Sequence, residues 1–163
     1  LAWCQHVTVK IDVRKSGFTA VLAAGMLLLA ACGSEAKNID AAALASSLVT
    51  DISYDDQLEQ ISDDDVSMYI DVPDGVKTVM YMGSGSTAEE VAVFEAPDKD
   101  TAATVKDNVQ TYLDDQSDSF QDYIPEESKR IGNAVLEQKD QYVILCVSGD
   151  SDGAKEIIEK AFK

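Results

Sequence analysis

The sequence contains very little histidine and few basic residues. Its one histidine is His6, and its 13 lysines and arginines face 30 aspartates and glutamates, for a formal net charge of −17. A surface this acidic repels nucleic acid and anionic lipid headgroups, so we expect no nucleic-acid partner. Because His6 lies in a segment expected to be removed, the remaining chain lacks the imidazole of a Ser-His-Asp or Cys-His system or of a zinc site.

The sequence also has no hydrophobic run long enough to stay in a membrane. The longest, residues 17–31, is uncharged and follows Lys10, Arg14 and Lys15. As a helix it would span about 22 Å, against a hydrocarbon core of roughly 30 Å. A basic segment followed by a short apolar one is typical of a secretory signal. We therefore expect residues 1–31 to be a removable leader.

The leader ends in LAACG at residues 29–33, which resembles the lipobox of bacterial lipoproteins. In proteins with that motif a diacylglycerol thioether forms on the cysteine, here Cys32, and the signal peptidase cuts just before it. Two acyl chains are what stable anchoring requires. Residues 32–38 are then a lipidated tether that holds an extracytoplasmic domain to the cell membrane. The other lipobox positions are Leu29, Ala30, Ala31 and Gly33. The alternative is a buried cysteine that ends an apolar core helix.

The cysteines leave no pair for an internal disulfide. Cys4 goes with the leader and Cys32 carries the lipid, so Cys146 is the single free thiol. It lies in the almost wholly apolar segment 142–147, where a buried cysteine behaves as a small hydrophobic side chain. A nucleophilic role needs an exposed, electropositive setting, which neither this segment nor the overall charge supplies.

The hydrophobic pattern predicts a single α+β domain over residues 39–163. The predicted helices are one capped by Asn38 or Asp40 and ending near 51, a short one opened by 63–65, a long one from about 98, and one over 152–162. The predicted strands are 76–82, 89–96, 134–139 and 142–148. Two strand-strand-helix units most simply build a four-stranded antiparallel sheet with the helices on one face, a two-layer sandwich.

A glycine- and serine-rich stretch joins the first two predicted strands and is a candidate ligand loop. It comprises Gly83, Ser84, Gly85, Ser86 and Thr87. No Gly-Lys-Ser/Thr follows and no helix begins there, so neither a phosphate loop nor a nucleophile elbow is assembled. We favour a hairpin connection, with a contact to a small molecule or peptide as the alternative.

Clustered carboxylates offer two further alternatives. Asp150, Asp152 and Glu159 partly match the spacing of a calcium loop, but Ser148 replaces the leading aspartate and a strand precedes the loop. We favour a turn in which Asp150, Ser151 or Asp152 caps the last helix. The acidic pairs elsewhere are better explained as a solvated face than as the two positioned carboxyls of a glycosidase.

Several segments together are similar to those of a known family. They are VMYMGSGSTAEEVAVFEA at 79–96, TAATVKDNVQTYLDDQSDSFQDYIPEE at 101–127, and QYVILCVSGD at 141–150 followed by a terminal helix. With the lipobox, they resemble the small lipoproteins of Gram-positive anaerobes grouped as domain of unknown function 4358. That family has no assigned activity, so the resemblance implies a location and a fold without a mechanism.

These observations favour a non-catalytic envelope lipoprotein that binds an envelope protein or a small ligand. We expect it to be a monomer without a cofactor. The alternative is a divalent-cation or small-ligand binder that uses its surface carboxylates, and a carboxylate-based hydrolase comes third because it requires a deep pocket with raised carboxyl pKa values.

Overall fold

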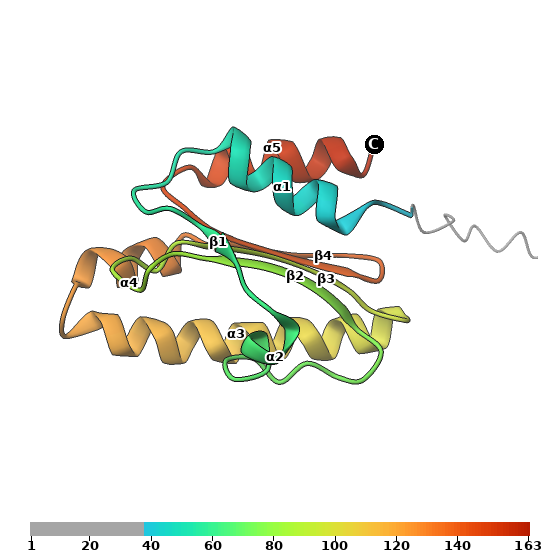
Figure 1. The fold of residues 1–163 in the computed structure, drawn as a ribbon, viewed down its shortest axis with the longest axis horizontal. Helices are drawn as coiled ribbons and strands as arrows, with labels where there is room; N and C mark the ends of the chain where they lie inside the picture. Colours follow the sequence, from blue (N-terminus) through green and yellow to red (C-terminus); the bar gives the residue numbers. More distant parts are fainter. Residues whose placement is uncertain (1–37) are drawn as a thin grey trace, which may run out of the picture. The chain divides into compact units, whose positions relative to one another are not determined.

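The computed structural model describes residues 38–163, so the predicted leader, the lipobox and Cys32 lie outside the described residues. Along this part of the chain the elements follow in the order α1 (Ala41–Asp51), β1 (Glu59–Gln60), α2 (Asp63–Val66), β2 (Lys77–Met82), β3 (Glu90–Glu95), α3 (Lys99–Gln121), α4 (Pro125–Gly132), β4 (Val135–Lys139), β5 (Tyr142–Val147) and α5 (Ser151–Ala161). Figure 1 shows them around one central sheet. No helix among these residues is long and apolar enough to cross a membrane.

The sheet is antiparallel throughout and has the strand order β1-β2-β3-β5-β4. At its centre Val93 lies between Val79 of β2 and Ile144 of β5. The prediction of four strands was wrong, because β1 adds a fifth at the edge. This strand is only Glu59–Gln60, paired with Met82 and Tyr81, and two exposed polar residues carry no alternating pattern that a sequence could reveal.

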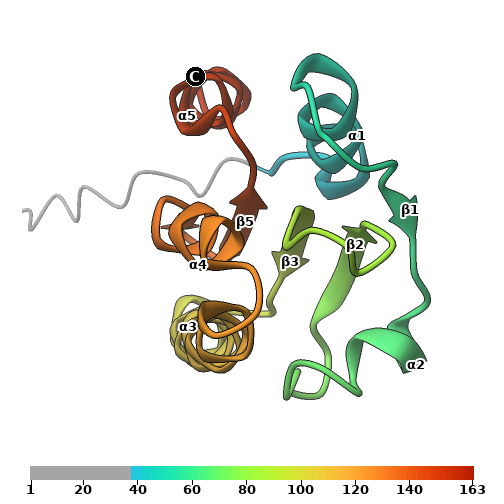
Figure 2. The ribbon, with the colours of Figure 1, turned by 90° about the vertical axis from the view of Figure 1, so that its left-hand side faces the viewer.

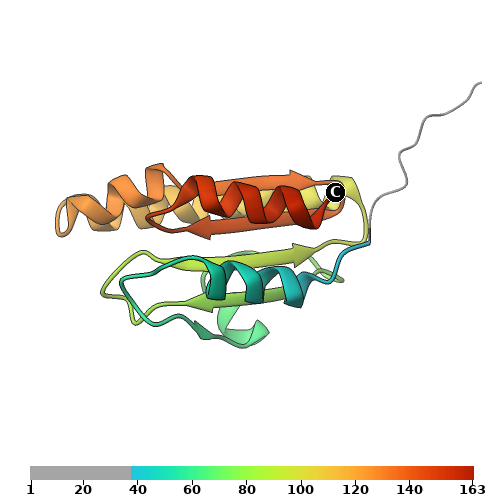
Figure 3. The same cartoon turned by 90° about the horizontal axis from the view of Figure 1, so that it is seen from above.

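Helices cover both faces of the sheet, so the prediction of helices on one face was also wrong. Helices α1 and α5 lie on one face, while α2 and α3 lie on the other (Figures 1 and 2). From above, α1 and α5 run side by side along the sheet (Figure 3). The physical reason lies in β5, which is buried at all six positions. A strand buried on both faces reads as a continuous apolar run rather than as alternation.

Each face of the sheet has its own hydrophobic core. Alternate residues of β3 and β5 divide between the two, as the side-chain period of two requires. Toward α3 the sheet presents Ala92, Phe94, Val143 and Leu145. Toward α1 and α5 it presents Val91, Val93, Ile144 and Cys146. The two central strands thus carry the packing of all three layers.

Side-chain caps fix where the major helices begin. Asp40 accepts a hydrogen bond from Ala43 N at 3.0 Å, Asp98 accepts one from Thr101 N at 2.7 Å, and Asp150 accepts one from Gly153 N at 2.9 Å. Each satisfies a backbone donor that the first helical turn leaves free. Asn38, placed in the predicted tether, already belongs to the folded part, since its Oδ1 accepts a hydrogen bond from Tyr142 Oη at 2.9 Å.

Candidate functional site

A polar cleft of about 740 Å³ lies where α4 ends and α5 begins. It is lined by Glu126, Lys129, Arg130, Gly132, Asn133, Ala134, Ser148, Gly149, Asp150, Ser151, Asp152 and Lys155. Its volume falls in the range of small-molecule sites, but its lining contains no aromatic residue. It is larger than three other cavities among the described residues, of about 410, 310 and 180 Å³, and it suits a hydrophilic ligand.

Local sequence explains how the two walls of the cleft form. On one side Pro125 begins α4, with acidic residues in the first turn and Lys129 and Arg130 in the last, as the helix dipole favours. On the other side Asp150 caps α5 and donates its own backbone N–H to Ser148 Oγ at 3.2 Å. Ser151 Oγ donates to Asn133 O at 2.6 Å, which joins the two walls.

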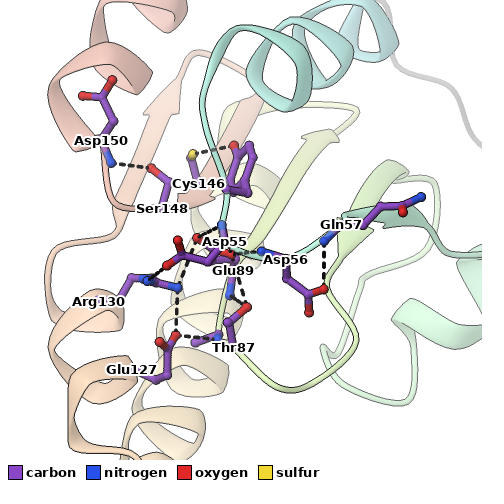
Figure 4. A network of polar contacts seen from close by, with 12 residues as sticks. Asp55, Asp56, Gln57, Thr87, Glu89, Glu127, Arg130, Cys146, Ser148 and Asp150 are labelled. Carbon is purple, nitrogen blue, oxygen red and sulfur yellow. Dashed lines mark hydrogen bonds and ion pairs between the residues drawn. The ribbon is translucent and has the colours of Figure 1, made fainter.

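Arg130, which lines the cleft, forms ion pairs with three carboxylates (Figure 4). Its Nη1 lies 3.1 Å from Glu127 Oε2 and 3.1 Å from Glu89 Oε1, and its Nη2 pairs with Asp55 Oδ2. Of these, the Glu89 and Glu127 side chains are only 2% and 8% exposed. Buried carboxylates are stable only when paired and hydrogen-bonded, so this set depends on the guanidinium.

Backbone groups complete the environment of the two buried carboxylates. Glu89 accepts hydrogen bonds from Asp55 N and Asp56 N at 2.9 Å each, and from Thr87 Oγ1 at 3.3 Å. Glu127 Oε2 accepts one from Ala88 N at 2.8 Å. We call Arg130, Glu127, Glu89 and Asp55 the arginine network. It joins α4 to the loop after α1 and to the connection between β2 and β3, so its described bonds make it a structural support for the cleft.

The candidate ligand loop is fastened to the same region through Asp56. Ser84 donates from both its backbone N and its Oγ to Asp56 Oδ2, each at 2.6 Å, and these bonds hold the pKa of the Asp56 carboxyl below its usual value. A Cβ at Gly83 would lie 2.8 Å from that same oxygen. Gly83 and Ser84 line a smaller cavity of about 310 Å³, separate from the cleft. Thr87 is engaged with Glu89, so the loop is a structured connection.

The three weak candidates for a calcium site are not brought together. Asp150 caps α5, Asp152 Oδ1 lies 3.7 Å from Lys155 Nζ, and Glu159 Oε2 lies 3.7 Å from Lys163 Nζ. Because α5 is helical from Ser151, Asp152 and Glu159 are separated by about 10 Å along its axis, too far for one ion. Within residues 38–163 no cluster of three or more His, Cys, Asp or Glu side chains could hold a metal.

Cys146 lies within the core that faces α1 and α5, and its Sγ is 3.6 Å from Tyr54 Oη. Burial raises the pKa of the Cys146 thiol, so the reactive thiolate is disfavoured. Burial likewise raises the pKa of Tyr54, whose hydroxyl donates to Leu48 O at 2.9 Å. The contact is part of the packing between α1 and the sheet.

On the face of the sheet toward α3, the Glu90 carboxyl is buried, and only one of its two oxygens has a hydrogen-bond partner. Tyr112 Oη donates to Glu90 Oε2 at 2.8 Å, and Gln116 Nε2 donates to Tyr112 Oη at 2.6 Å. The Oε1 atoms of Glu90 and Gln116 are both buried without a partner among the described residues. Burial therefore raises the pKa of Glu90 to about 8, so this carboxyl is mostly protonated at neutral pH.

A family model matches the chain over residues 53–148, and its description is Domain of unknown function (DUF4358). The chain belongs to this family. No curated protein and no solved structure matches the chain. The region matched to the DUF4358 model contains the whole arginine network but ends at Ser148, so the α5 wall of the cleft lies beyond it.

Sequence reasoning missed most of the residues that define this end of the DUF4358 domain. No separate helix was predicted where α4 lies, and no role was predicted for Glu89 or Glu127. One signal was available: Arg130 is the only arginine among residues 38–163, where acidic residues predominate. An isolated arginine in such a chain indicates a specific carboxylate cluster, because its planar fork suits bidentate and multiple pairing.

Proposed function

We propose that this chain is a lipid-anchored extracytoplasmic binding module whose ligand occupies the polar cleft. The observation that carries the binding part is the cleft itself, a cavity of about 740 Å³ supported by buried and well-partnered side chains. Pre-formed concave sites with a few convergent polar groups are where small ligands bind. The described residues contain no histidine and bury their one thiol, so we assign the cleft no catalytic step.

The position of Asn38 supports the anchored arrangement. Asn38 contacts Tyr142, whose ring packs against Phe162 just after the last residue of α5. The cleft lies at the first residues of α5, about 16 Å away along an 11-residue helix. An anchor on Cys32 would therefore enter the domain at the end opposite the cleft, leaving the cleft accessible from outside the membrane.

Mass spectrometry of the protein isolated from cell membranes tests the anchor. We expect a diacylglycerol thioether on Cys32 as the new N-terminal residue, and a Cys32→Ala variant that retains its leader and lacks the lipid. A wild-type chain with a bare thiol still joined to residues 1–31 would contradict this part of the proposal.

Blocking the cleft tests the binding part. Gly149 has no positive φ, and a Cβ there meets nothing within 4 Å, so Gly149→Leu should fold while filling the cleft. We expect a panel of amino acids, short peptides and neutral sugars to include compounds that shift the NMR signals of Gly132 and Asn133, and Gly149→Leu to abolish those shifts. Ala103→Leu, on the exposed side of α3, is the matched control. Shifts that survive in Gly149→Leu would place the site elsewhere.

A further inference from the structure

The α4 wall of the cleft carries two opposite charges that are free to meet a ligand. Glu126 and Lys129 are both exposed and both line the cleft. Neither side chain takes part in any of the ion pairs formed among residues 38–163. Residues three apart lie on the same face of a helix, with their Cβ atoms about 5–6 Å apart. The wall thus presents a carboxylate and an ammonium side by side without pairing them to each other.

The cleft is also lined by balanced charge, in a strongly acidic chain. Its three acidic residues, Glu126, Asp150 and Asp152, are matched by Lys129, Arg130 and Lys155. These are three of the nine lysines and arginines among residues 38–163. A fully acidic surface would repel a carboxylate, whereas this lining can accept a carboxylate and an ammonium at once.

Two of the cations retain capacity for a ligand. Arg130 pairs with three carboxylates, but a guanidinium has five N–H donors, so two donors remain. Lys155 lies 3.7 Å from Asp152, whose side chain is 97% exposed, and such a loose surface pair is easily exchanged for a ligand. Arg130 on the α4 wall and Lys155 on the opposing wall can therefore share an incoming carboxylate with Lys129.

We infer that the cleft binds dipeptides with free ends, with the dipeptide ammonium at Glu126 and its carboxylate at Lys129, because an extended dipeptide spans only about 7 Å. Capture of charged peptide ends is a recurrent recognition mode. The side-chain oxygen of Asn133, an exposed residue of the lining, accepts no hydrogen bond within residues 38–163 and can accept one from the peptide N–H. This inference rests on the proposed function, because it names the ligand class of the same cleft.

Calorimetry on the full chain in detergent micelles tests the inference with alanyl-alanine in three forms. The first has both ends free, the second is N-acetylated and the third is C-amidated. We expect the free peptide to bind and each cap to weaken binding at least tenfold, because each removes one of the two charges that the cleft recognises.

Two variants assign each peptide end to a residue. Glu126→Gln should bind the free and the N-acetylated peptide equally, while remaining sensitive to C-amidation. Lys129→Gln should show the reverse. Glu156→Gln and Lys106→Gln, which change the same residue types outside the cleft lining, should keep both sensitivities. This pattern of exchanged sensitivities would not arise from a general loss of stability.

The outcomes separate this inference from the proposal on which it rests. Absence of heat with alanyl-alanine, or equal affinity for all three forms, would overturn the inference. If other compounds of the panel still bind and Gly149→Leu abolishes their binding, the cleft remains the binding site and only the ligand class is wrong. Peptide binding that is unchanged in Gly149→Leu would overturn both.

Discussion

Two neighbouring glutamates, Glu89 and Glu90, are almost equally buried, at 2% and 1% exposure, yet lie in very different surroundings. Glu89 faces the loops near α4, where it meets Arg130, two backbone N–H groups and a threonine hydroxyl. Glu90 faces α3 and meets one tyrosine hydroxyl, with its second oxygen unpartnered. The partners that a fold supplies, rather than the depth of burial, therefore decide whether a buried carboxyl is compensated.

The largest effect is expected from removing the guanidinium that compensates Glu89. In Arg130→Met the carboxylates of Glu89 and Glu127 stay buried without their cation, which should cost about 3–5 kcal/mol in the free energy of unfolding. Urea denaturation measures this. Lys99→Met, which breaks an exposed pair with Asp140, is the matched control and should cost less than about 1 kcal/mol. Equal losses in the two variants would mean that the arginine network contributes no more than a surface pair.

An effect of similar size concerns the way in which Glu90 makes the free energy of unfolding depend on pH. Its pKa is about 8 in the folded protein against 4.5 as the ordinary value, so the folded state holds the proton more tightly. The stabilisation is fully present below pH 4.5 and is lost as the pH rises to about 8. In Glu90→Gln this dependence should disappear, making the variant more stable than the wild type above pH 8, by on the order of 5 kcal/mol.

Urea denaturation of both proteins between pH 5 and pH 9 checks this. Glu95→Gln, a change to a partly exposed glutamate at the other end of β3, is the control and should follow the wild-type curve. A Glu90→Gln variant that loses stability toward pH 9 as steeply as the wild type would assign the dependence to other groups.

A smaller effect is expected at the cap that shapes the α5 wall. Asp150→Ala removes the acceptor for Gly153 N, which should cost about 1 kcal/mol in thermal unfolding experiments. Asp152→Ala, at an exposed position of the first turn, should change the unfolding free energy by less than half as much. If the two variants lose the same stability, the cap adds nothing beyond a favourable charge near the helix dipole.

The smallest effect should come from an exposed charge pair that involves neither Glu89 nor Glu90. Lys77 Nζ is 3.3 Å from Glu95 Oε2 across β2 and β3, and the lysine side chain is 78% exposed. Lys77→Gln should change the unfolding free energy by about 0.5 kcal/mol or less, and less still in 0.5 M salt. A loss of unfolding free energy as large as that of Arg130→Met would mean that buried and exposed ion pairs contribute equally to stability.

Much of the fold could be predicted because its signals are local. The apolar runs of β3 and β5, the stripe of apolar residues on α3, and caps such as Asp98 depend on a few neighbouring residues. Family membership was likewise predicted from continuous segments, and the match over residues 53–148 confirms it. The missed elements are those without such a signal: β1 is two polar residues long, and α4 is a short helix that begins at Pro125, soon after α3 ends at Gln121.

The candidate site was less predictable because its parts are distant in sequence. Arg130 pairs with Asp55 across 75 positions, and Ser151 reaches Asn133 across 18. The predicted ligand loop lines a different, smaller cavity, while the cleft combines α4, which was not predicted, with the turn before α5. Pairings of this kind follow from strand order, which no short segment encodes.

The sequence by itself determined the acidic surface, the positions of the main strands and helices, and the apolar character of the two central strands, because charge and hydrophobic periodicity are properties of neighbouring residues. Only the tertiary structure decided that helices cover both faces of the sheet, that Glu89 is compensated while Glu90 is not, and that a charge-balanced cleft forms beside Arg130. Those outcomes depend on which distant groups the strand order brings within hydrogen-bonding distance. Where a side chain is only a few per cent exposed, such contacts replace the water that would otherwise solvate its charge.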